Sequence, residues 1–104
     1  MTRTLRVDPA VVLEIREAVR WYEGREAGLG ARFVTQLDEA MGRAAALGPD
    51  CRPAVGVDPA LGVRRVLVRQ FPYVVFVVVV EPHVRVIAVA HGRRRPGYSR
   101  PRLR

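Results

Sequence analysis

The chain has 104 residues, a length at which one compact domain buries most of the surface that its unfolded chain exposes, so we expect a single domain over residues 1–104. Hydrophobic residues make up 49% and charged residues 27%, a balance that excludes an intrinsically disordered chain. The formal net charge of +8 argues against an acidic, cation-binding protein and indicates a negatively charged partner.

The positive charge is unevenly distributed, and all 18 basic residues are arginine. Residues 1–50 hold seven arginines against eight acidic residues, whereas residues 51–104 hold eleven against two, a net charge of +9. The second half should therefore meet a polyanion or an acidic protein. The absence of lysine has two explanations, a genome that encodes basic residues as arginine or selection for multidentate phosphate contacts.

Cysteine usage and hydropathy exclude several classes. Cys51 is the only cysteine, so the chain can form no internal disulfide and no cysteine-based metal cluster. We expect no metal ion, no cofactor and a cytoplasmic location, since the first residues lack the pattern of a secretory signal. The longest uncharged apolar run, residues 71–80, is far shorter than the ~20 residues that cross a bilayer as a helix. We therefore expect a buried strand there and no membrane partner.

A short strand and a helix are predicted first. Residues 4–7 alternate between apolar and polar side chains, as in a strand. Asp8 and Pro9 then mark a helix start, because aspartate caps helices and proline suits their first turn. This helix should leave Glu14 and Glu17 to solvent. Its apolar face recurs at spacings of four, three and four residues and consists of Val11, Ile15, Ala18 and Tyr22.

A second helix follows a glycine-rich hairpin at residues 24–30. It should end at Gly48 and Pro49, because glycine terminates helices and proline cannot continue them. Trp21, next to Tyr22, is assigned to packing of the core and of this hairpin. The apolar stripe of the second helix is predicted to be Phe33, Leu37, Ala40 or Met41, and Ala44.

The remainder of the chain is predicted to be a loop, a sheet and an arm. Residues 50–62 contain two prolines without periodicity and indicate a loop. Residues 63–69, 73–81 and 84–90 are rich in β-branched residues and predict three strands of an antiparallel meander. Residues 92–104 hold six arginines and are expected to form a basic C-terminal arm.

These elements predict an α+β fold. The N-terminal short strand and the helical hairpin should pack on a three- to four-stranded antiparallel sheet. We expect Ile15, Phe33, Leu37, Val75 and Val77 in its core. The basic residues expected to contact a polyanion or a protein partner are Arg64, Arg65, Arg69, Arg93, Arg94 and Arg95.

Three segments carry a resemblance to a known family: they read AVRWYEGREAGLGARFVTQLDEAM, VRRVLVRQFPYVVFVVV and VRVIAVAHGRRRPGY. In their order and spacing they resemble the RelE/ParE superfamily of bacterial toxins. The resemblance covers nearly the whole chain. It implies the toxin half of a type II toxin-antitoxin pair, which inhibits growth until a cognate antitoxin binds it in a hetero-oligomer.

The family divides by activity, so the resemblance leaves the target open between DNA gyrase and ribosome-bound mRNA. Its ribonuclease members have lysines on the strand before the central strand and an arginine directly after the tyrosine of the central strand. Here these positions hold Arg65 and Leu67, and Val74. The departures favour a ParE-like toxin that poisons gyrase over a RelE-like endoribonuclease. A third hypothesis is a decayed toxin retained as an antitoxin-binding module.

Cleavage of RNA at a 2′-hydroxyl needs a proton acceptor, a cation for the developing phosphate charge and a proton donor. Arginine supplies only the cation, since its pKa lies above 12. If the protein is a ribonuclease, the catalytic residues are therefore expected to be His91, Tyr98 and Arg65. His91 is alternatively a structural hydrogen-bonding residue at the end of a buried strand.

Overall fold

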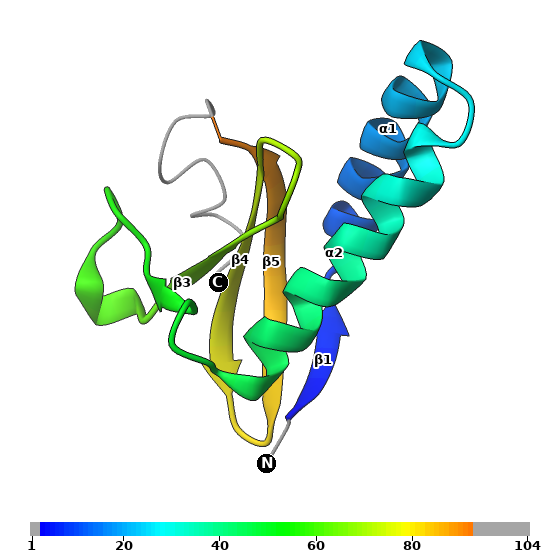
Figure 1. Cartoon of the computed structure of the whole chain (residues 1–104). Helices are drawn as coiled ribbons and strands as arrows, with labels where there is room; N and C mark the ends of the chain where they lie inside the picture. Colours follow the sequence, from blue (N-terminus) through cyan, green and yellow to red (C-terminus); the bar gives the residue numbers. More distant parts are fainter. Residues whose placement is uncertain (1–2, 93–104) are drawn as a thin grey trace.

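The computed structural model describes residues 3–92, in which two helices pack on one face of a five-stranded sheet (Figure 1). The α+β architecture predicted from the sequence is confirmed. The helices and strands in chain order are β1 (Thr4–Val7), α1 (Pro9–Arg25), α2 (Leu29–Ala46), β2 (Arg52–Pro53), the short 3-10 helix η1 (Pro59–Leu61), β3 (Arg64–Leu67), β4 (Tyr73–Val80) and β5 (His83–His91).

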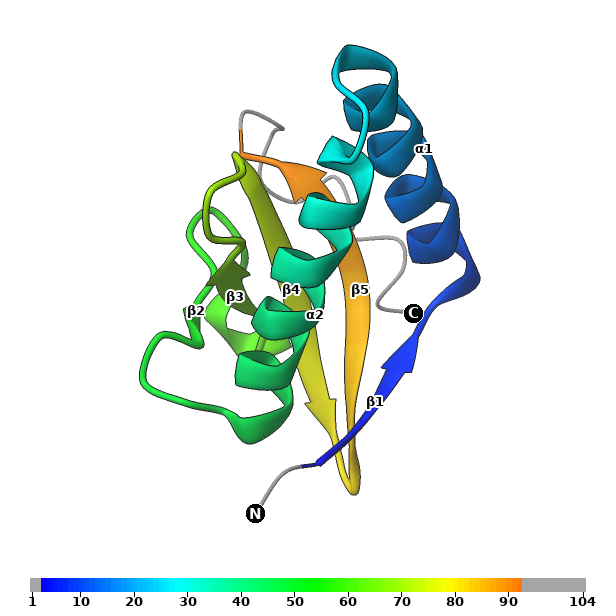
Figure 2. The same ribbon diagram turned by 45° about the vertical axis from the view of Figure 1, so that its right-hand side comes forward.

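The sheet contains the predicted antiparallel meander of β3, β4 and β5 and gains one strand at each edge. β1 lies parallel to β5 and forms one edge of the sheet (Figure 2). A tight turn cannot join two parallel strands, and here the chain passes through both helices and β2, β3 and β4 before it reaches β5. At the other edge, the two residues of β2 pair with β3 inside the segment predicted to be a loop. Proline is tolerated there because an edge strand leaves one backbone side unpaired.

The start of α1 is fixed by an ion pair between distant parts of the chain. The helix begins at Pro9 as predicted, but the carboxylate of Asp8 makes no capping hydrogen bond. Arg85 on β5 instead donates to it twice, from Nε to Oδ1 at 2.9 Å and from Nη2 to Oδ2 at 2.7 Å. This two-point contact joins the entry of α1 to β5, which lies between β1 and β4 in the sheet.

The hairpin between α1 and α2 is held by Glu23. Its carboxylate accepts the backbone N–H groups of Gly28 at 2.9 Å and of Gly30 at 3.0 Å, which satisfies donors at the start of α2. Gly28 has a φ of 89°, in the left-handed region that favours glycine. A Cβ on Gly30 would lie 3.0 Å from the backbone oxygen of Val19, so only glycine lets the two helices approach this closely.

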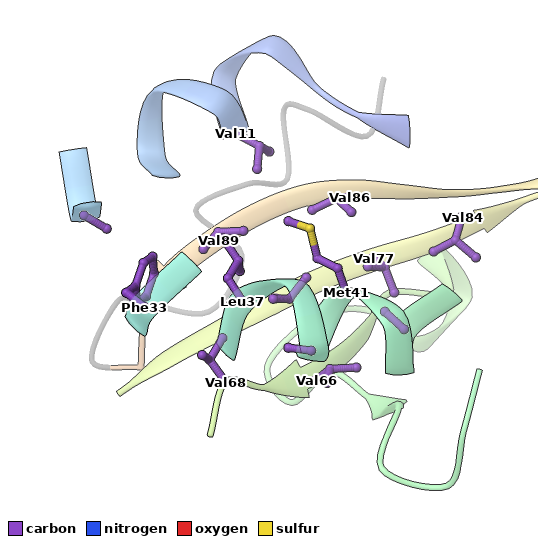
Figure 3. Close-up of a cluster of buried hydrophobic side chains, with 14 of the residues drawn as sticks. Val11, Phe33, Leu37, Met41, Val66, Val68, Val77, Val84, Val86 and Val89 are labelled. Carbon is purple, nitrogen blue, oxygen red and sulfur yellow. The ribbon is translucent and has the colours of Figure 1, made fainter. Parts of the chain in front are cut away.

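The main core lies between the helices and the sheet, and Figure 3 shows the side chains of α2 pointing into it. The predicted stripe of α2 is confirmed, with Phe33 fully buried and Leu37 only 2% exposed. Val75 and Val77 are also fully buried. Ile15, expected in the core, is only partly buried and packs against its margin.

A smaller core covers the face of the sheet that points away from the helices. Val78 and Ile87 from the sheet pack there with Val63, and Ala54 and Val57 from the segment predicted to be a loop lie against them. That segment therefore covers a sheet face that two helices cannot reach. Within residues 3–92, no helix is both long enough and apolar enough to cross a membrane.

Candidate functional site

Two cavities in the described part of the chain contain sequence-predicted site residues. The first is a pocket of about 510 Å³ between α1 and the adjacent ends of β4 and β5, here called the α1 pocket. The second is a smaller cavity of about 350 Å³ at the β2 edge of the sheet, here called the arginine cleft. The α1 pocket contains His91, and the arginine cleft contains Arg65.

His91 ends β5 and faces the helices. It lies opposite Tyr73 on β4, with ring centroids 5.6 Å apart at an interplanar angle of 71°. Tyr73 in turn contacts the rings of Tyr22 and Phe33, at centroid distances of 6.0 and 5.1 Å. Burial raises the pKa of the Tyr22 phenol, so this side chain stays protonated at neutral pH.

The same pocket holds two carboxylates from α1. Glu14 was expected to point into solvent, but it is partly buried and accepts a hydrogen bond from the backbone N–H of Val89 at 3.5 Å. Glu17 lies one helical turn further along and lines the same cavity. Among the described residues that line the α1 pocket, none is an arginine. The α1 pocket is therefore acidic, although the protein as a whole is basic.

Trp21 forms the outer wall of the α1 pocket. It was assigned to core and hairpin packing, but its side chain is 56% exposed, whereas its neighbour Tyr22 is buried. The Cζ atom of Arg25 lies 4.6 Å from the centre of the Trp21 ring, within cation–π distance. An exposed tryptophan beside a cavity is a typical feature of binding sites.

The arginine cleft places two cations directly opposite each other. Arg52 on β2 and Arg65 on β3 are partners in the antiparallel register, so their side chains share one sheet face. Among residues 3–92, no acidic side chain forms an ion pair with either. Like charges in this position repel, which leaves both guanidinium groups available to an anion from outside. Leu67, 54% exposed, lies beside them.

The other two arginines of the cleft differ in how far they are used within the protein. Arg43 pairs with Glu39 at 2.9 Å and with Asp50, and it donates to the backbone oxygen of Leu67 at 2.7 Å. Arg69, predicted to contact a partner, lies 3.5 Å from the Glu39 carboxylate and is mostly exposed. Arg43 therefore positions the cleft, while Arg69 remains available at its rim.

Arg64 lines neither the α1 pocket nor the arginine cleft. Predicted to contact a partner, it donates to the backbone oxygen of buried Cys51 at 3.2 Å, so part of its role is structural. Burial raises the pKa of the Cys51 thiol, which keeps it protonated. Arg93, Arg94, Arg95 and Tyr98, also predicted site residues, lie outside the described residues.

A scan against protein-family models and a search of curated proteins find no match to this sequence. Among solved structures, the chain is similar to one from a structure of the "Chromosomal ParDE TA system from P. aeruginosa", where TA denotes toxin-antitoxin. The two chains superpose with a TM-score of 0.65 at 17% sequence identity, over 86% of this chain and 96% of that chain. This chain has a ParE-like fold. At this identity the likeness describes the backbone, so the chemistry of the site must come from the residues themselves.

Within this ParE-like fold, the predicted catalytic residues Arg65 and His91 do not share a site. Arg65 pairs with Phe76 and so points away from the helices, whereas His91 pairs with Tyr73 on the helix-facing side. A β-bulge causes the difference. Ile87 is an extra residue in β5, which moves the residues after it to the opposite face from the one that strict alternation would give them.

Sequence reasoning missed two members of the site. Arg52 lies in a segment with no strand periodicity, and only the register with β3 places it opposite Arg65. Glu14 follows a pattern typical of a solvated helix face, and only the packing of α1 against β5 brings it to the pocket. In residues 3–92, no three His, Cys, Asp or Glu side chains are grouped closely enough to hold a metal ion.

Proposed function

We propose that this protein is the toxin of a type II toxin-antitoxin pair and arrests bacterial growth by poisoning DNA gyrase rather than by cutting RNA. The ParE-like fold supports the first part of the proposal, because the similar chain comes from a ParDE toxin-antitoxin system. The lone cysteine and the absence of a disulfide are consistent with action in the cytoplasm.

The observation that carries the second part is the separation of Arg65 from His91 by the sheet. A ribonuclease needs a cation next to its proton-transferring group, since the developing phosphate charge and the proton lie on neighbouring atoms. His91 instead shares its pocket with Glu14 and Glu17. Two carboxylates repel a phosphate, so the α1 pocket is a poor site for mRNA cleavage.

The arginine cleft is the region that the proposal assigns to partner contact. Arg52 and Arg65 have no acidic partner among the described residues, and Leu67 adds an exposed apolar side chain between Arg65 and Arg69. Cationic groups around an apolar centre suit an acidic, amphipathic protein segment. We therefore assign this surface to the cognate antitoxin in a hetero-oligomer, and propose that gyrase competes for it.

One observation favours a ribonuclease as the second candidate. Tyr73 and His91 contact each other, and Glu14 lines the same pocket, so three groups that can transfer protons meet there. In that case the cation would have to come from Arg93, Arg94 or Arg95, and Tyr98 would serve as the further predicted catalytic residue.

The test is induced expression in bacteria with three separate measurements: growth, cleavage of translated mRNA and plasmid supercoiling. The proposal expects growth arrest, intact mRNA and altered supercoiling. Cleaved mRNA with normal supercoiling would replace it with the endoribonuclease. Normal growth with a folded protein would instead favour a decayed toxin that still binds its antitoxin, which pull-down with the protein encoded by the adjacent gene would reveal.

A further inference from the structure

The α1 pocket has the chemistry of a guanidinium site. Glu14 and Glu17 supply two negative charges on one face of α1, and Trp21, Tyr22 and Tyr73 supply aromatic walls. A planar cation with several N–H donors satisfies both, because carboxylates accept its hydrogen bonds and aromatic faces attract its charge. A phosphate or a carboxylate ligand would be repelled.

Trp21 already binds one guanidinium on this protein. Arg25, four residues later on α1, places its Cζ atom 4.6 Å from the ring centre. Trp21 is also the only tryptophan of the chain and is 56% exposed, so it contributes little to the core. Its position at the mouth of an acidic cavity is accounted for by a ligand that stacks on it.

The occupant is indicated by where the described chain ends. His91 and Pro72 both line the α1 pocket, and Gly92, directly after His91, donates its N–H to the oxygen of Pro72 at 2.7 Å. The next residues in the sequence are Arg93, Arg94 and Arg95, and segment 93–104 holds six arginines and no acidic side chain. Each residue spans at most about 3.6 Å, so these arginines start within a few residues of the pocket wall.

We propose that the α1 pocket binds the guanidinium group of an arginine from segment 93–104 of the same chain. The effective concentration of a side chain tethered this closely is in the millimolar range or above, so even a weak contact is populated. The contact neutralises Glu14 and Glu17 with the chain's own surplus of positive charge. It does not depend on the toxin function proposed above.

The lone tryptophan gives a direct measurement on the full chain. Acrylamide quenching of Trp21 fluorescence is followed from low salt to about 1 M NaCl, where the Debye length falls to about 3 Å. For the parent protein we expect the quenching constant to rise at least about twofold with salt, as the screened arginine leaves the ring. A parent protein whose quenching constant does not change with salt would overturn the proposal.

Two sets of variants identify the contact. Two triple variants replace arginines of the segment by glutamine: one changes Arg93, Arg94 and Arg95, and the other changes Arg100, Arg102 and Arg104. In at least one of them, the quenching constant at low salt should rise to the value that the parent shows at high salt. Glu14→Gln with Glu17→Gln should do the same. Combining the effective arginine variant with the glutamate variant should raise the quenching constant no further, because both variants remove the same contact.

The matched control removes three charges far from the pocket. Arg52→Gln, Arg65→Gln and Arg69→Gln together change the net charge equally and lie at the β2 edge, so this variant should quench like the parent at every salt concentration. If both arginine triples near the C-terminus also behave like the parent, no arginine of the segment occupies the pocket. Should the glutamate variant fail to fold by circular dichroism, the arginine variants decide the question, since they leave residues 3–92 unchanged.

Discussion

Tyr73 and His91 face each other across β4 and β5 with their rings 5.6 Å apart, on the side of the sheet that carries the helices. This contact connects the end of β5 to the aromatic cluster formed by Tyr22 and Phe33. His91 thus lies in an acidic pocket, away from Arg65.

The first prediction concerns His91. His91→Gln should retain growth arrest to within about tenfold of the parent in a dilution assay. Removal of a general base costs about 10²–10⁴-fold in rate, and the gyrase poisoning proposed above requires no such base. Growth after induction is measured together with the melting temperature of the purified variant. A variant that folds but no longer arrests growth would contradict the proposal that the protein poisons gyrase.

The second prediction concerns the facing arginines of the cleft. Arg52→Ala with Arg65→Ala should abolish growth arrest, because the surface assigned to target and antitoxin loses its two available cations. The melting temperature should be unchanged or slightly higher, since like charges opposite each other are removed. Arg6→Ala with Arg16→Ala is the control, because it removes equal charge from β1 and α1. Equal toxicity of the two double variants would show that only net charge matters.

The third prediction tests the core stripe of α2. Leu37→Ala should lower the free energy of unfolding by about 2–5 kcal/mol and Phe33→Ala by about 3–5 kcal/mol, because both side chains are buried. Val34→Ala, on the exposed side of the same helix, should cost less than about 1 kcal/mol. Urea denaturation of the three variants measures the difference, and similar midpoints would mean that α2 is rotated.

The fourth prediction uses two glycines at the hairpin. Gly30→Ala should lower the melting temperature, because its Cβ would meet the backbone oxygen of Val19 at 3.0 Å and the Glu23 carboxylate at 2.9 Å. Gly24→Ala should raise the stability by up to about 1 kcal/mol, since its Cβ meets nothing within 4 Å and alanine favours the helix. Thermal melts that rank the two variants in the opposite order would contradict the close helix contact.

The fifth prediction is a pH dependence at Asp50. The hydrogen bond from the Arg43 guanidinium holds the pKa of this carboxyl below its ordinary value of 3.8. The unfolded chain therefore takes up the proton first, so the stabilisation is present above that value and is lost as the pH falls through the lowered pKa. Asp50→Asn should be less stable than the parent at neutral pH, with the gap closing below about pH 4. A gap independent of pH would assign the effect to packing.

The local sequence pattern was sufficient to predict the helices and the central strands. The stripe from Phe33 to Ala44 follows the helical period, and β4 and β5 are dominated by β-branched residues, so both could be predicted within a few residues of their observed ends. β2 could not, because two residues that include a proline carry no periodic signal. Its strand character comes only from its partner β3.

The sequence by itself thus determined the α+β class, the hairpin and the distribution of charge, since these depend on neighbouring residues and on composition. The tertiary structure alone decided which side chains meet. Asp8 and Arg85 are 77 positions apart, and their ion pair requires β1 to lie beside β5. The bulge at Ile87 places His91 on the helix face, away from Arg65. A shift of one residue in a strand exchanges the two faces of the sheet, and only long-range packing fixes that register.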